Sequence, residues 1–127
     1  MSTAEVLAVL ADVSRLPVWA PGFADQVTGD ATAGWQVSKN GHRFELHVQV
    51  NERAATVDYL RQLTSGHYGG AYLRSTPRPG GGSVTTMTMP VPPNEHPVDR
   101  AAVLDSELGN LARLLGTLAP AGPAIHE

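Results

Sequence analysis

The sequence of 127 residues contains no cysteine, which excludes disulfide bonds, thiolate metal sites and cysteine nucleophiles. Lys39 is its only lysine and the arginines stand singly, so no basic stripe is available for a nucleic-acid backbone. No apolar run is long enough to cross a bilayer, and "MSTAEVLAVLADV" lacks the basic start and cleavage site of a signal peptide. We therefore expect a cytoplasmic protein with no nucleic-acid partner and no membrane insertion.

The length is that of one ordinary domain, which would bury about two-thirds of its unfolded surface around a single core. We assign residues 1–120 to this domain. The last residues, "AGPAIHE", continue no helical or strand pattern. We therefore predict a disordered tail over residues 121–127.

The first segment has the pattern of a short amphipathic helix. Ser2 and Glu5 have the spacing of a capping box, in which the hydroxyl caps the first turn and the carboxylate reaches back. The apolar residues that follow at helical spacing are Val6, Leu7, Leu10 and Val13. Ser14 is expected to cap a second short turn, and Pro17 and Pro21 prevent anything longer.

Alternating apolar and polar residues from about residue 25 to residue 90 predict strands. Asn40-Gly41 predicts a hairpin, because both residues tolerate the positive φ angles of a type I′ turn. The other connections are too short for crossover helices, so the strands should form an antiparallel meander.

A second helix is predicted after the proline-rich stretch of residues 90–97. Pro97 suits its first turn, and Asp99 favours its positive end. Its apolar stripe consists of Leu104, Leu108, Leu111, Leu115 and Leu118. The order of elements predicts an α+β fold, with short N-terminal helices, a curved antiparallel sheet of about six strands and a long C-terminal helix packed across it.

The stretch "RLPVWAPGF" supports a more specific interpretation. Its Leu16, Pro17, Trp19, Pro21 and Gly22 match an "lp.W.pg" pattern, and the predicted strands and leucine-rich helix follow in the expected order. In these features the chain resembles the helix-grip (START-like, SRPBCC) superfamily, which includes birch-pollen-allergen and polyketide cyclase/dehydrase-like proteins. The resemblance covers most of the chain. It implies a cavity between sheet and C-terminal helix that binds an apolar or aromatic small molecule, with no cofactor.

One feature departs from that superfamily. Its members usually begin with a strand that lies between the second and last strands of the sheet, whereas this chain begins directly with a helix. The last strand, "SVTTMTM", would then lose a ladder partner and leave a β-prone edge open. We therefore expect either a homodimer formed through this sheet edge or a part of the chain that covers the edge.

The residues expected to line the cavity combine aromatic, apolar and a few polar side chains. Trp19 and Phe23 either line its mouth or plug the end of the sheet, while Tyr59 and Arg61 share a strand face and could orient a ligand. Arg61 could equally lie in solvent at its strand end. The full expected set is Trp19, Phe23, Phe44, Leu46, Tyr59, Arg61, Tyr72, Met87, Met89, Leu108 and Leu111.

The sequence is also compatible with two other functions. The first is a cyclase, dehydratase or aromatase type of enzyme, in which Tyr59, Arg61, Tyr72 and Arg74 would move protons. The second is a homodimeric interaction module whose cavity is filled by its own side chains.

Histidines offer little support for catalysis or for a metal site. His67 and His96 lie in loops, where either could approach a cavity mouth. His42 and His47 are an odd number of residues apart on one strand, so they should point to opposite faces. We predict no metal site.

Overall fold

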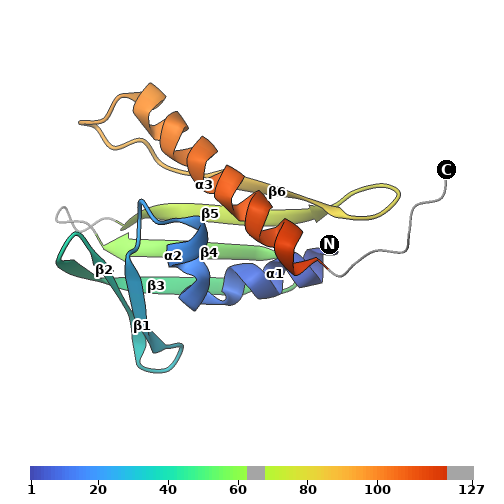
Figure 1. The fold of residues 1–127 in the computed structure, drawn as a ribbon, viewed down its shortest axis with the longest axis horizontal. Helices are drawn as coiled ribbons and strands as arrows, with labels where there is room; N and C mark the ends of the chain where they lie inside the picture. Colours follow the sequence, from blue (N-terminus) through green and yellow to red (C-terminus); the bar gives the residue numbers. More distant parts are fainter. Residues whose placement is uncertain (63–67, 120–127) are drawn as a thin grey trace.

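The structure is a computed structural model, and it describes residues 1–62 and 68–119. Its elements in chain order are α1 (Thr3–Ala11), the 3-10 turn η1 (Val13–Arg15), α2 (Leu16–Trp19), β1 (Gln26–Asp30), β2 (Gly34–Lys39), β3 (His42–Asn51), β4 (Thr56–Gln62), β5 (Tyr68–Pro77), β6 (Ser83–Thr88) and α3 (Pro97–Leu118). The six strands form one antiparallel sheet in sequential order, β1 to β6, and α3 crosses it (Figure 1). This arrangement confirms the predicted α+β fold of helix-grip type.

The predicted hairpin between β2 and β3 is confirmed. Asn40 and Gly41 have φ angles of 51° and 79°, as a type I′ turn requires. The hairpin sets Val37 opposite Phe44, and the next ladder sets Val48 opposite Tyr59. One face of the sheet therefore collects the apolar side chains of successive strands.

The segment before the sheet follows the predicted pattern with one correction. Ser2 caps α1 by accepting a hydrogen bond from the Glu5 backbone N–H at 3.2 Å, and its hydroxyl donates to the Glu5 carboxylate at 3.0 Å. Ser14 was expected to cap the second turn but instead donates to the Asp12 carboxylate at 2.5 Å. A charge-assisted bond to a carboxylate two residues away is stronger than the cap that the hydroxyl oxygen would make with the backbone N–H groups of a four-residue helix.

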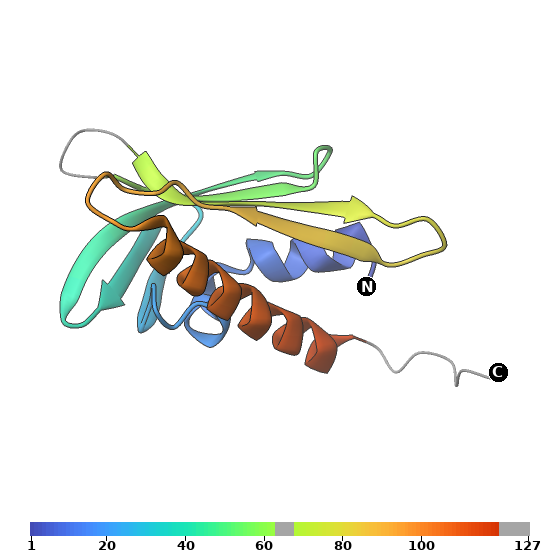
Figure 2. The same cartoon turned by 90° about the horizontal axis from the view of Figure 1, so that it is seen from above.

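The core lies between the inner face of the sheet and the helices, all of which cover that one face (Figure 2). Its largest fully buried side chains are Trp19, Leu10, Leu16, Leu46, Leu73, Leu111, Val6, Val13, Val37 and Val57. Figure 2 also shows α1 beneath the sheet at the end away from the loop that joins β6 to α3.

The long helix α3 begins where the sequence predicts. His96 caps it by accepting a hydrogen bond from the Val98 backbone N–H at 3.2 Å, and Pro97 occupies its first turn. Leu111 is 1 % exposed, whereas Leu118 at the end of the stripe is 37 % exposed. The other leucines of the inner face, Leu104, Leu108, Leu114 and Leu115, are partly buried against the core.

The meander leaves β1 and β6 as the two edge strands of the sheet. β1 pairs only with β2 and β6 only with β5, so one side of each faces no other strand of the described residues.

Within residues 1–62 and 68–119, no helix combines the length and apolar character that a bilayer crossing demands. The predicted tail of residues 121–127 and the candidate His67 lie outside the described residues.

Candidate functional site

A pocket of about 500 Å³ opens between α2, the inner face of β4 and β5, the β6–α3 loop and the first half of α3. This volume lies within the range of small-molecule sites. Its lining consists of Leu16, Trp19, Ala20, Phe23, Tyr59, Arg61, Gly69, Gly70, Ala71, Met89, Pro90, Val91, Pro92, Pro93, Arg100 and Glu107.

The space exists because three small residues follow Tyr68, the first residue of β5. Gly69, Gly70 and Ala71 line the pocket, so this end of the strand has almost no side-chain volume to fill it. Gly70 has a φ of +152°, and a Cβ at that position would lie 1.8 Å from the Tyr59 carbonyl oxygen. Only glycine fits there, and the close approach of β4 and β5 depends on it.

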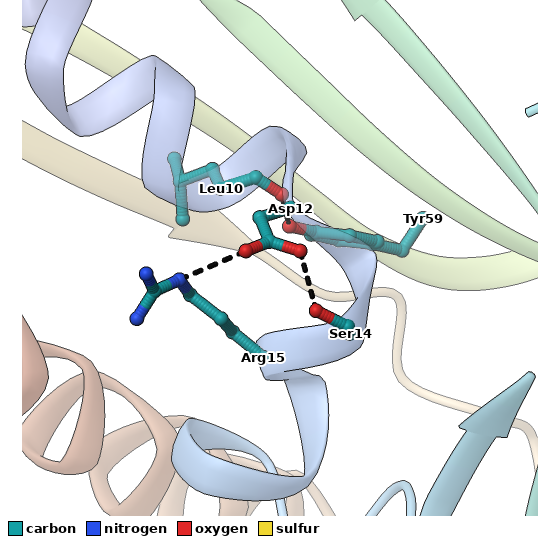
Figure 3. Close-up of polar contacts among 5 residues, drawn as sticks. All are labelled: Leu10, Asp12, Ser14, Arg15 and Tyr59. Carbon is teal, nitrogen blue, oxygen red and sulfur yellow. Dashed lines mark hydrogen bonds and ion pairs between the residues drawn. The ribbon is translucent and has the colours of Figure 1, made fainter. Parts of the chain in front are cut away.

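Two buried aromatic rings form one wall. The Trp19 and Tyr59 ring centroids lie 5.8 Å apart at an interplanar angle of 59°. The Tyr59 hydroxyl donates a hydrogen bond to the Leu10 carbonyl oxygen at the end of α1 (Figure 3). Burial raises the pKa of Tyr59, and the nearby Asp12 charge acts in the same direction. Tyr59 therefore stays neutral and presents its ring, while its hydroxyl is engaged with α1.

The polar contacts in Figure 3 hold the turn that leads to Trp19. The Asp12 carboxylate accepts hydrogen bonds from the Ser14 hydroxyl at 2.5 Å and from Arg15 Nε at 3.0 Å. The bond from Ser14, followed by those from Arg15, lowers the pKa of Asp12. An ionised carboxylate at the end of α1 thus stabilises η1, the turn that leads into α2.

Aromatic contacts also shape the mouth. Phe23 meets Phe44 edge to face, with ring centroids 5.2 Å apart at 69°. The Arg61 guanidinium carbon lies 4.0 Å from the Phe44 ring centroid, a cation–π contact on the pocket's exposed side. Arg61 thus lies at the solvent boundary of the pocket, as a residue that both lines the cavity and contacts water.

A buried carboxyl group lies on the α3 side of the pocket. Glu107 is 6 % exposed and lines the cavity. Burial raises the pKa of Glu107 to about 7, and the positive charge of Arg100 acts in the opposite direction. Near neutral pH this group can therefore both hold and release a proton.

Arg100 lies on the same face of α3, two turns before Glu107. Its Nη2 bonds to the Glu95 carboxylate at 2.5 Å, and its Nη1 lies 3.9 Å from the Met89 sulfur. Its Nε is buried without a hydrogen-bond partner in the described part of the chain. The Arg100 guanidinium is thus paired with a carboxylate, but one of its N–H donors has no acceptor in the described part of the chain.

The structure brings five of the expected site residues together in the pocket, namely Trp19, Phe23, Tyr59, Arg61 and Met89. Phe44 borders it through its contacts with Phe23 and Arg61. The apolar residues Leu46, Met87, Leu108 and Leu111 lie instead in or against the filled core.

Tyr72 lies outside the pocket. It is 39 % exposed and is paired with Asp58, whereas its neighbour Ala71 is paired with Tyr59 on the inner face. Because side chains alternate along a strand, Tyr72 and Arg74 both project from the outer face. The sequence pattern left the orientation of this strand open, and its register places Leu73 inward.

Glu107 and Arg100 were not among the expected site residues, although the sequence carried a signal for Glu107. It follows Leu104 by three residues and precedes Leu111 by four, so it interrupts the apolar face of the helix. A charged residue at such a position is a candidate pocket group. The proline-rich loop carries no comparable signal, since prolines at helix entries are common.

The described residues contain no cluster of three or more histidine, aspartate or glutamate side chains that could hold a metal ion. No protein-family model matches the sequence, and no curated protein is significantly similar to it.

Proposed function

We propose that this protein binds an apolar or aromatic small molecule in the pocket between the sheet and α3, without a fixed cofactor. The observation that carries the proposal is a cavity of about 500 Å³ in which aromatic walls surround very few polar groups. This is the composition expected of a ligand site, in which apolar surface supplies affinity and a few polar atoms set orientation.

The arrangement of the walls supports an aromatic ligand in particular. Trp19 and Phe23 come from the α2 region and Tyr59 from β4, and all three rings line the pocket. Aromatic rings gain from offset and edge contacts with one another beyond the area that they bury. The helix-grip arrangement agrees with the resemblance noted from the sequence, which implies the same ligand class.

Native mass spectrometry of the purified protein, before and after gentle denaturation, tests the proposal first. A retained small molecule of defined mass would support it and identify the ligand. Titration with 1-anilinonaphthalene-8-sulfonate is the second test, with saturable binding at one site expected. Failure to retain any molecule, together with non-saturable binding of this probe, would argue that the pocket holds no ligand.

A catalytic role in the same pocket, of cyclase or dehydratase type, is the second candidate. Glu107 favours it, because a buried carboxyl group with a pKa of about 7 suits general acid–base chemistry at neutral pH. Exchange of the methyl protons of 2-acetylnaphthalene in heavy water, followed by NMR, tests for such chemistry. Catalysed exchange that Glu107→Gln abolishes would support an enzyme, and exchange at the buffer rate would remove this candidate.

We also propose that the open edge of β6 forms a homodimer. Its backbone groups on one side face no other strand of the described residues, and Val84 is 47 % exposed. Unpaired edges of this kind favour pairing with another chain. Light scattering should give the mass of a dimer, and Val84→Lys should shift it toward monomer; a monomer for the unchanged protein would contradict the proposal.

A further inference from the structure

Glu107 is the acidic side chain among the residues that line the pocket. It is 6 % exposed, and within the described residues no hydrogen bond or direct ion pair reaches its carboxyl group. The charge that acts on its pKa is that of Arg100, and Arg100 is itself ion-paired with Glu95 at 2.5 Å. The carboxyl of Glu107 is therefore available to a molecule that enters the cavity.

A buried polar group without a partner costs free energy, whereas a leucine at this position would simply extend the apolar face of α3. Glu107 faces the pocket and lies among the partly buried leucines of that face. A ligand group that pairs with the carboxyl would remove the cost when it binds. Affinity would then depend on the chemistry of that ligand group.

We propose that Glu107 selects the ligand: the pocket takes an aromatic molecule bearing a hydroxyl group, which donates a hydrogen bond to the Glu107 carboxylate. This inference rests on the proposed function, since it names the ligand class of the same pocket.

The charges around the pocket narrow the choice to a neutral donor. Arg61 and Arg100 both line the cavity, which disfavours a cationic ligand. An anionic group beside Glu107 would meet a like charge. A ketone can only accept, so it would need the protonated form of Glu107. A neutral hydroxyl adds no charge and donates directly to the carboxylate.

The proposal has a pH signature because Glu107 titrates near neutrality, with a pKa of about 7. A hydroxyl donor binds the ionised form, so its affinity should rise as the pH increases from 6 to 8. The other charged or titratable groups facing this space are Arg100 on α3, Tyr59 and Arg61 on β4, and Glu95, which is paired with Arg100. Burial keeps Tyr59 neutral over this range.

Calorimetric titration with 2-naphthol and 2-methoxynaphthalene tests the proposal, since one added methyl group removes the hydrogen-bond donor and leaves the naphthalene ring unchanged. At pH 8 the protein should bind 2-naphthol about tenfold more tightly, as a hydrogen bond to a charged group implies. At pH 6 this preference should shrink by severalfold. Glu107→Leu should reduce it to within about twofold at both pH values.

Two control variants separate the effect of the Glu107 charge from that of its acceptor oxygen and from that of a charge removed elsewhere. Glu107→Gln keeps an acceptor oxygen and similar size, so it should retain some preference for 2-naphthol and lose its pH dependence. Glu45→Gln, an exposed change on β3, should behave as the unchanged protein. Equal binding of both probes by the unchanged protein would overturn the inference and leave ligand binding in place. Binding of neither probe would overturn both.

Discussion

The two ends of the sheet's inner face are covered differently. At one end α1 contacts β4 and β5, and Val57 and Leu73 are almost fully buried beneath it. At the other end the same pair of strands presents Gly69 and Ala71, and about 500 Å³ stays open. One hairpin thus contributes both a filled core and the wall of a cavity.

The difference shows how a small domain can keep a cavity and still fold. Large aliphatic side chains at one end supply the burial that stabilises the fold, while small residues and a proline-rich loop leave the other end open. A proline-rich loop cannot pair with the sheet, and it contributes short side chains to the cavity rim. The stability of the protein should therefore depend on one end and ligand affinity on the other.

The largest expected effect tests the filled end. Leu73→Ala should lower the free energy of unfolding by about 2–5 kcal/mol, because it removes a fully buried side chain and leaves a void. Urea denaturation measures this value. Met89→Ala, at the partly buried pocket end, should cost only about 1 kcal/mol, since its side chain borders open space. Equal losses would show that the two ends are packed alike.

The second expectation concerns the buried carboxyl of the open end. Well below pH 4.5 Glu107 is protonated in both the folded and the unfolded state, so its titration does not change the free energy of unfolding there. Because its folded pKa is raised to about 7, the folded state binds the proton more tightly, and stability falls as the pH rises from 4.5 to 7.

Glu107→Gln removes this titration. Relative to the variant, the free energy of unfolding of the unchanged protein should fall by about 2 kcal/mol between pH 4.5 and pH 8. This is less than the full pKa shift implies, because solvent in the open pocket screens the charge. Urea denaturation across this range checks the value. A constant difference between the two proteins would mean that solvent reaches Glu107 freely.

The third expectation fills the cavity. Ala71→Leu points a larger side chain into the pocket and should weaken binding of 1-anilinonaphthalene-8-sulfonate by about tenfold, with little change in stability. Ala101→Leu makes the same change at an exposed position of α3 and should leave binding unaltered. Undiminished binding to Ala71→Leu would place the probe elsewhere on the protein.

The smallest expected effect tests the junction between the two ends. Tyr59→Phe removes the hydroxyl that donates to the Leu10 carbonyl oxygen and leaves that buried acceptor unpaired. The free energy of unfolding should fall by about 1–2 kcal/mol, while probe affinity should change little because the ring remains. A large loss of affinity would show that the hydroxyl, rather than the ring, serves the ligand.

Much of the fold could be predicted from local patterns. The capping box at Ser2, the Asn40-Gly41 turn and the leucine periodicity after Pro97 each depend on residues close together in the chain. The site was less predictable. Trp19 and Tyr59 were expected in the cavity on chemical grounds, yet Tyr72 was expected there too, and alternation alone does not say which face of a strand is inward.

The sequence by itself determined the elements, their order and the antiparallel meander, because turn chemistry and apolar periodicity act over a few residues. Only the tertiary structure decided which wall each strand contributes. The register of β4 against β5 turned Leu73 inward and Tyr72 outward, and the path of α3 brought Glu107 over the glycines of β5. These placements depend on contacts between segments far apart in the chain, so no local pattern could specify them.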